Sequence, residues 1–333
     1  MLDLLSCGFL VADIVVADLD KIAEPGELVF APKGITISVG GHPANIAIDL
    51  VKLGVPGDRI GVAGAVGSDI FGEFIERVLA SYGLKLFLQK VDRSTNKNVI
   101  LVVKGEDRRF HVELGASRVF SPSMVLKLID ETRPKVFYLA SGILDLIDER
   151  IEEIFKKARE KGALTFADIV KPYGKDWSYI VPAMKYIDVF HCNESELKEL
   201  TGTESLKEAV NRVFNYGVRL LLITMGEKGA LGATRRMNIL QKAFKVNVVD
   251  PTGAGDAFCA GVIYKLLEYG ITGDKVSEID VDKLKQILLY AQAVGASACT
   301  APGTTAGVSR MKVEELVKAQ GEEILANTAI NTV

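Results

Sequence analysis

Short apolar runs alternate with amphipathic segments along most of the chain. Apolar runs that predict buried strands span residues 4–12, 59–63, 135–140, 163–167, 186–191 and 219–224. Amphipathic segments that predict helices span residues 43–53, 70–82, 148–161, 194–200, 206–216, 254–269 and 281–300. Helices between buried strands place the strands parallel and cover both faces of their sheet. The pattern therefore predicts an α/β fold with a mostly parallel sheet covered on both faces.

Two stretches interrupt this alternation. Residues 14–39 and 98–114 contain no good helix and are typical of extended hairpins, with turn sequences that begin at Glu24 and Lys104. We expect them to form a small antiparallel sheet beside the main one. The last residues, 321–333, are predicted to be a frayed helix.

Composition and charge narrow the class of protein. The chain has 333 residues, of which 48% are hydrophobic, and its 40 basic and 43 acidic residues give a net charge of −3. This balance lacks the basic excess of a nucleic-acid binder. The four cysteines form no CxxC pair, which argues against a disulfide framework or a zinc site and fits a reducing cytoplasm. The start has no basic region of a signal peptide, and no apolar stretch is long enough for a membrane span.

The most informative segment is a glycine-rich turn between a strand and a helix, Gly253-Ala254-Gly255. Free N–H groups at a helix start and the helix dipole both favour a negative group such as phosphate. Asp256 follows in the first helical turn, where an acid competes with an anion for the same field. It either stabilises the helix start or acts as a general base beside a phosphate site.

A second segment places a Gly-Gly turn before another predicted helix. Pro43 suits the first helical position, and Gly40 and Gly41 make a turn that a ligand can touch. Asn45 both donates and accepts hydrogen bonds, which suits a polyol. Alone, this segment is usually only a turn.

Together, the two segments resemble the paired signatures of the ribokinase-like (PfkB) carbohydrate kinase family. The patterns GG-x-x-x-N-x-A and GAGD-x-F are matched in order by Gly40, Gly41, Asn45, Ala47, Gly253, Ala254, Gly255, Asp256 and Phe258. Supporting pieces follow the order of the family and include Gly8, Asp13, the turn 67–72, the motif 193–196 and the loop 224–229. The resemblance covers about residues 4–308.

The resemblance implies an ATP-dependent kinase that phosphorylates a hydroxyl of a sugar or sugar-like molecule. It implies one ribokinase-like domain over residues 1–333, a three-layer α/β/α fold with a lid formed by parts of 14–39 and 98–114. Asp256 would be the catalytic base, and the amides of 253–255 would form an anion hole for the transferring phosphate. The residues implied to bind the acceptor are Asp13, Gly40, Gly41 and Asn45.

The nucleotide and ion sites are implied in the same way. The residues implied to contact ATP are Asn193, Thr224, Gly226, Gly229 and Gln292. Glu196 would hold Mg²⁺ through water, which fits the preference of that ion for oxygen ligands. Asn193 also suits an N-terminal helix cap. Asp250 and Thr252 are implied ligands of a monovalent cation such as K⁺, although Pro251 departs from the usual family sequence.

Several alternatives remain open from the sequence. The first signature, Gly-Gly-His-Pro-Ala-Asn, is more similar to fructokinase or keto-deoxygluconokinase members than to ribokinase members. Nucleoside and inositol kinases, and a catalytically silent sugar-binding regulator, are alternatives on the same fold. A dinucleotide oxidoreductase is rejected, because the first strand is not followed by G-x-G-x-x-G. The expected partners are a small sugar-like molecule, ATP and a second copy of the chain through the lid, with no nucleic acid or membrane.

Overall fold

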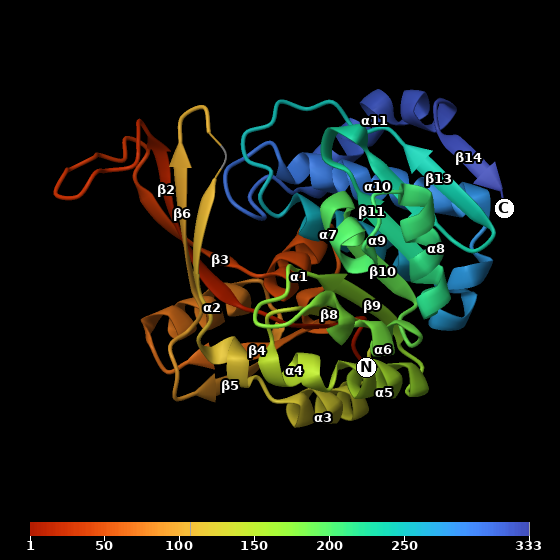
Figure 1. The fold of residues 1–333 in the computed structure, drawn as a ribbon, viewed down its shortest axis with the longest axis horizontal. Helices are drawn as coiled ribbons and strands as arrows, with labels where there is room; N and C mark the ends of the chain where they lie inside the picture. The colour runs from red at the N-terminus through yellow and green to blue at the C-terminus, as the bar shows by residue number, and fades with distance from the viewer. Residues whose placement is uncertain (107, 333) are drawn as a thin grey trace.

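The computed structural model describes residues 1–106 and 108–332, which form a ten-stranded main sheet and a separate four-stranded sheet (Figure 1). The main sheet runs in the order β14-β13-β12-β11-β10-β9-β8-β1-β4-β5. Neighbours from β11 to β5 pair in parallel, and β12, β13 and β14 add antiparallel. Its strands are β1 (Leu4–Cys7), β4 (Ile60–Gly67), β5 (Lys85–Val91), β8 (Val136–Ser141), β9 (Leu164–Ile169), β10 (Val189–Asn193), β11 (Leu220–Thr224), β12 (Ala230–Ala233), β13 (Met237–Gln241) and β14 (Ala329–Thr332).

Helices cover both faces of the main sheet and complete a three-layer α/β/α fold. One face carries α1 (His42–Lys52), α2 (Ile70–Ser81), α9 (Ala254–Glu268) and α10 (Val281–Ala298), with α11 (Arg310–Ala326) packed against α10. The other carries α3 (Pro122–Thr132), α4 (Asp145–Glu149), α5 (Ile151–Glu160), α6 (Val181–Met184), α7 (Glu194–Thr201) and α8 (Leu206–Tyr216). Because strand side chains alternate between faces, Phe137 packs on Phe155 of α5 while Tyr138 packs within the opposite core.

The predicted first strand, residues 4–12, is two strands. β1 ends at Cys7, and Gly8 then adopts a φ of 150°. The chain leaves the main sheet and enters the small one as β2 (Val11–Leu19). Hydrophobicity continues through the break because the residues on both sides are buried, so the apolar run could not reveal it. Asp13 consequently lies within β2, not beyond the end of a main-sheet strand.

The small sheet has the strand order β3-β2-β6-β7 and stands beside the body of the molecule, on the left in Figure 1. It contains β2, β3 (Ile35–Gly40), β6 (Lys97–Val103) and β7 (Arg109–Glu113). The pairs β2–β3 and β6–β7 are antiparallel, but β2 and β6 are parallel. The prediction of a purely antiparallel sheet is therefore wrong, because the two hairpins lie side by side with their first strands in the same direction.

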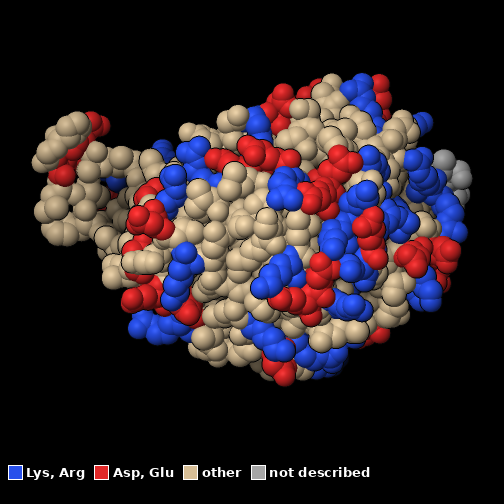
Figure 2. Space-filling model, turned by 90° about the horizontal axis from the view of Figure 1, so that it is seen from below, with Lys and Arg blue, Asp and Glu red and all other residues tan. Residues whose placement is uncertain are grey.

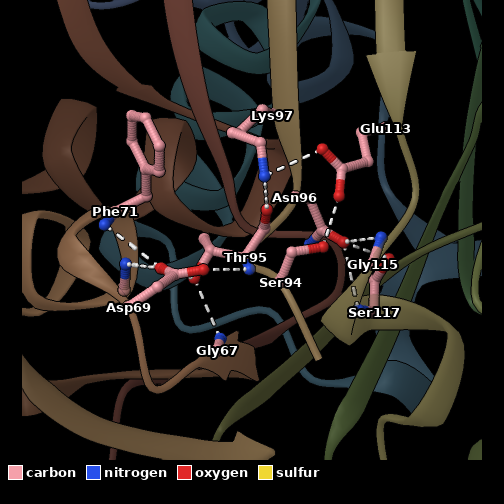
Figure 3. Close-up of polar contacts among 11 residues, drawn as sticks. Gly67, Asp69, Phe71, Ser94, Thr95, Asn96, Lys97, Glu113, Gly115 and Ser117 are labelled. Carbon is pink, nitrogen blue, oxygen red and sulfur yellow. Dashed lines mark hydrogen bonds and ion pairs between the residues drawn. The ribbon is translucent and has the colours of Figure 1, made fainter. Parts of the chain in front are cut away.

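A hydrogen-bonded junction joins the small sheet to the body (Figure 3). The Asp69 carboxylate, at the N-cap of α2, accepts from the amides of Phe71, Gly72 and Thr95. The hydroxyl of Thr95 donates to Asp69 and accepts from the amide of Gly67 at the end of β4. The turn at 67–72 thus fixes the chain that enters β6.

The predicted frayed helix over residues 321–333 is helical only as far as Ala326. The helix α11 extends to Ala326, and β14 then pairs with β13 at the edge of the main sheet. A free sheet edge offers unpaired backbone groups, which an added strand satisfies. Val333, and Asp107 in the turn that begins at Lys104, lie outside the described residues. None of the described helices combines the length and the apolar character needed to cross a membrane.

Candidate active site

Asp256 lies in the first turn of α9, where α9 packs against the start of α1. Its side chain is buried, and its Oδ2 accepts a hydrogen bond of 2.7 Å from Nδ2 of Asn45 on α1. Gly253 caps the helix with a φ of 79°, and a Cβ there would lie 2.3 Å from the carbonyl oxygen of Thr304. The turn therefore requires glycine for both conformation and space. Of the three predicted anion donors, the Ala254 amide already donates to the Pro251 carbonyl at 3.2 Å.

The carboxylate of Asp13 approaches the same site from the small sheet. A Cβ at position 40 would lie 1.9 Å from its Oδ2, so Gly40 makes room for this side chain. Its Oδ1 accepts a 3.0 Å hydrogen bond from Nδ2 of Asn98 on β6. Burial raises the pKa of Asp13 to about 6, the Asn98 hydrogen bond opposes this, and the charge of Asp256 raises it further. Asp13 and Asp256 therefore lie close enough to repel each other, although Asp13 lies in the small sheet and Asp256 in helix α9.

Two acceptor atoms in this site lack a hydrogen-bond partner. They are the buried amide oxygens of two side chains, Oδ1 of Asn45 and Oδ1 of Asn98. Leaving a buried polar group unpaired costs about 1–3 kcal/mol. A ligand with several hydroxyl donors would satisfy these atoms together, and Asn98 is a residue that the sequence had not indicated.

A histidine–aspartate network beneath the site was also missed by sequence reasoning. His42 is the first residue of α1, and its Nδ1 lies 2.6 Å from Oδ1 of Asp256 and 3.6 Å from Oδ2 of Asp168. Asp168, near the end of β9, accepts hydrogen bonds of 2.9 Å from the Tyr138 hydroxyl and from Ile169 N, and its Oδ1 lies 2.9 Å from Nδ1 of His191.

The charges in this network stabilise one another. Burial alone would lower the pKa of His42, but the carboxylates of Asp256 and Asp168 raise it well above its usual value. Burial alone would raise the pKa of Asp168, but His191 and His42 lower it far below its usual range. Both residues carried a signal in the sequence, since His42 is part of the first signature and Asp168 directly follows a predicted strand.

The residues expected near the nucleotide lie at the ends of β10 and β11. Asn193 caps α7 in a reciprocal capping box, in which Asn193 Oδ1 accepts from the Glu196 amide and Glu196 Oε2 accepts from the Asn193 amide, each at 2.9 Å. The hydroxyl of Thr224 lies 3.3 Å from Nε2 of His191, which links this region to the acidic centre. Gly226 and Gly229 form the next turn with positive φ angles.

No contact that the structure shows for Gln292 joins it to the other residues expected near the nucleotide. Its Nε2 donates to Oε1 of Gln241 at 3.1 Å, and the side chain is buried between α10 and β13. This bond secures the helix to the sheet.

Asp250 and Thr252 lie immediately before the glycine turn and are tightly bonded. Asp250 Oδ1 accepts from the amide and hydroxyl of Thr252 at 2.9 and 2.6 Å, and its Oδ2 accepts from the Gly303 amide at 3.0 Å. Nη1 of Arg108, from the β6–β7 connection of the small sheet, lies 3.1 Å from Asp250 Oδ1 and also contacts the Thr252 hydroxyl. A guanidinium therefore holds the oxygens that the sequence assigned to a monovalent cation.

Comparison with known proteins decides the family. A family model described as pfkB family carbohydrate kinase matches residues 3–311. Fructokinase-2 of Solanum habrochaites is 30% identical over 289 residues, which cover 81% of this chain and 84% of that protein. The chain belongs to the pfkB family of carbohydrate kinases. A second relative of this pfkB kinase, the deoxyribokinase of Salmonella typhi, is 29% identical over 252 residues, covering 72% of this chain and 78% of that protein.

Solved structures share the fold of this pfkB kinase. A ribokinase from Giardia lamblia superposes with a TM-score of 0.80 at 21% identity, covering 95% of this chain and 99% of that one. A fructokinase with bound ATP from Xylella fastidiosa gives a TM-score of 0.79 at 22% identity, covering 96% and 98%. The predicted family, the three-layer fold with a mostly parallel sheet, and the class of ATP-dependent carbohydrate kinase are confirmed.

Proposed function

We propose that this enzyme transfers the γ-phosphoryl group of ATP to a hydroxyl of a ketose such as fructose, with Asp256 as the general base. The supporting observation is the pair of unpartnered amide oxygens, of Asn45 and Asn98, beside Asp13 and Asp256. A sugar presents adjacent hydroxyls that can donate to these amide oxygens and to the carboxylate of Asp13. In this arrangement Asp13, Asn45 and Asn98 orient the acceptor. Gly40 and Gly41 let the acceptor approach the backbone. Asp256 takes the proton of the attacking hydroxyl.

The glycine turn is suited to the phosphate that is being transferred. The amides of 253–255 lie at the N-terminus of α9, where the helix dipole favours negative charge. Preorganised donors of this kind stabilise charge that develops in the transition state. We expect the amides of Gly253 and Gly255 to contribute most, because that of Ala254 is already bonded to Pro251.

The nucleotide is proposed to bind at the carboxyl ends of β10 and β11, where α/β sheets commonly bind ligands. A surface hollow beside α7 has two lysines in its lining, Lys198 and Lys228, together with three glutamates, Glu194, Glu199 and Glu204. Asn193, Thr224, Gly226 and Gly229 remain the proposed contacts. Gln292 is the weakest member of the set, since it is bonded within the core.

Magnesium is proposed to bind near Glu196 through water. The capping box engages only Oε2 of the Glu196 carboxylate. Carboxylate oxygens are ligands that a hard, hydrated cation prefers. Burial raises the pKa of Glu196, the Asn193 amide opposes this, and a bound cation would favour the ionised form. When bound, Mg²⁺ would neutralise negative charge on the phosphates.

The proposed acceptor follows from the relatives. The proteins matched include fructokinases and a deoxyribokinase, so fructokinase, keto-deoxygluconokinase and ribokinase types are the first candidates. Nucleoside and inositol kinases and a silent sugar-binding regulator are the alternatives. We further propose that residues 1–333 form one kinase domain, that the small sheet is a lid, and that the enzyme is cytoplasmic, which its four free cysteines support.

A substrate screen tests this proposal. Purified enzyme with Mg²⁺ and ATP is assayed for ADP release with ketoses, aldoses, keto-deoxy acids, inositols and nucleosides. We expect saturable turnover with a ketose and weaker turnover with the other classes. Turnover only with a nucleoside or an inositol would replace the proposed acceptor, and sugar binding without ADP release from any acceptor would favour the regulator.

A further inference from the structure

His42 is held in a fixed position between two buried carboxylates. Its preceding residue, Gly41, has a φ of 93°, and a Cβ there would lie 2.0 Å from the carbonyl oxygen of Phe9. Pro43 follows and constrains the first turn of α1. The backbone thus sets where the ring lies, with 27% of its side chain exposed and the Nδ1 atom directed at Asp256 and Asp168.

Asp256, the proposed general base, lies among other acids. Asp256 is buried, and its charge raises the pKa of two neighbouring acids, Asp13 and Asp49. Burial and like charges both disfavour ionisation of a carboxylate, and ATP brings further negative charge. Within residues 1–106 and 108–332, His42 is the one basic side chain whose nitrogen lies within 4 Å of the Asp256 carboxylate.

The second carboxylate holds the histidine in turn. Asp168 is buried and is fixed by Tyr138, by His191 and by the Ile169 amide. Its Oδ2 lies 3.6 Å from Nδ1 of His42, the same ring nitrogen that lies 2.6 Å from Oδ1 of Asp256. Side chains from β9, α1 and α9 therefore meet at this one imidazole nitrogen.

We propose that His42, supported by Asp168, is a positioning residue that pairs with the Asp256 carboxylate and holds it in place while the acceptor binds. The inference rests on the proposed function, because it takes Asp256 as the base. His42 acts through Asp256 and does not exchange a proton with the substrate. Asn45 holds the other oxygen of Asp256, so that the carboxylate is fixed at both ends.

The charged groups around the pair of His42 and Asp256 determine the sign of the effect. Besides the pair itself they are Asp168 on β9, Glu196 on α7, His191 on β10, Asp49 on α1 and Asp13 on β2. The carboxylates of Asp256 and Asp168 raise the pKa of His42 well above its usual value, although burial opposes this. Replacing it by an uncharged residue removes a cation beside Asp256. The carboxylate should then take up a proton at a higher pH.

The decisive measurement is the pH dependence of kcat in the wild type and in H42Q, with H111Q as the matched control. His111 lies exposed on β7, away from this network. An opposite charge within about 4–6 Å shifts the pKa of a carboxylate by about 1–3 units. We expect the acid limb of the H42Q profile to lie about one pH unit or more above that of the wild type, and the H111Q profile to match the wild type. Coinciding acid limbs for H42Q and the wild type would overturn the proposal.

Histidine NMR provides a second test that needs neither turnover nor a folded H42Q. The ring of His42 should titrate above the ordinary value of about 6.5, and Asp256→Asn should lower its pKa. The proposal would also be overturned if the pKa of His42 were ordinary and Asp256→Asn left it unchanged. If no acceptor is phosphorylated but the His42 pKa responds to Asp256→Asn, the ion pair stands and the assignment as a kinase base fails.

Discussion

At the scale of single residues, the site depends on glycines that make room for acids. Gly40 would clash with the Asp13 carboxylate if it had a Cβ, and Gly253 would clash with the backbone at Thr304. The two signatures therefore specify space as well as backbone conformation. The second signature contains Asp256 itself, whereas Asp13 was indicated by a separate piece of the sequence near the first strand. The same motifs did not indicate Asn98 or Asp168, whose positions depend on sheet register and on the ends of distant strands.

Asp13 is expected to orient the acceptor without taking its proton. Charge-assisted hydrogen bonds contribute about 1.5–3 kcal/mol, so Asp13→Ala should lower kcat/KM for the acceptor by about ten- to a hundred-fold. The KM for ATP should change little. The matched control is Asp20→Ala, which removes an exposed acid just beyond β2. Unchanged acceptor kinetics in Asp13→Ala would move the sugar site elsewhere.

The pKa of Asp13 adds a pH dependence. Because burial raises this pKa to about 6, the side chain is ionised above that pH and takes up a proton as the pH falls through it. A protonated carboxyl loses its charge-assisted bonds to the sugar. The acceptor kcat/KM of the wild type should therefore fall below about pH 6, and Asp13→Asn should remove that limb. A limb that persists in Asp13→Asn would have to come from another group.

At the scale of elements, the periodicity predicted most of the buried strands and most of the long helices. It missed β5, α3, most of α11 and the strands β12, β13 and β14. In β5 most side chains are only half-buried, so its apolar pattern is weak. The strands β12 and β13 are four and five residues long and contain small or polar side chains. The pairing of β2 with β6 comes from tertiary packing, which no local pattern encodes.

The contact of Arg108 with Asp250 and Thr252 gives a prediction about K⁺. The guanidinium and a bound cation would need the same oxygens of Asp250 and Thr252. Wild-type activity should therefore be independent of K⁺ at constant ionic strength. Arg108→Ala should lower kcat by about ten-fold or more, as the loss of a charged hydrogen bond implies, and K⁺ should restore part of it.

Steady-state assays over a range of KCl, with choline chloride to hold ionic strength, measure this effect. Arg109→Ala is the matched control, because Arg109 pairs with the exposed Glu106. Saturable activation of the wild type by K⁺, unchanged in Arg108→Ala, would restore Asp250 and Thr252 as a cation site.

At the scale of the whole molecule, the small sheet projects from the body with a largely uncharged surface on the face shown in Figure 2. Exposed apolar side chains gather on this sheet and its loop, namely Leu28, Phe30, Ile35, Ile37, Phe110 and Val112. Soluble monomers rarely expose large apolar patches, so a patch of this kind marks an interaction site. We predict a homodimer through the lid.

Light scattering at micromolar concentration tests the dimer. The expected mass is twice that of the 36.1 kDa chain, and Ile37→Glu should shift it towards one chain by placing a charge in an apolar contact. Lys85→Glu, on the distant strand β5, is the control and should leave the mass unchanged. A strictly monomeric wild type would contradict the prediction.

The central claim is that Asp256 of a sugar-phosphorylating enzyme accepts the proton of the acceptor hydroxyl. Its most direct test is single-turnover and steady-state phosphorylation of the best acceptor by the wild type and by Asp256→Asn. General-base catalysis contributes about a hundred- to ten-thousand-fold, so kcat should fall by that range while sugar and ATP binding, measured by calorimetry, persist. Near wild-type turnover by folded Asp256→Asn would contradict the account.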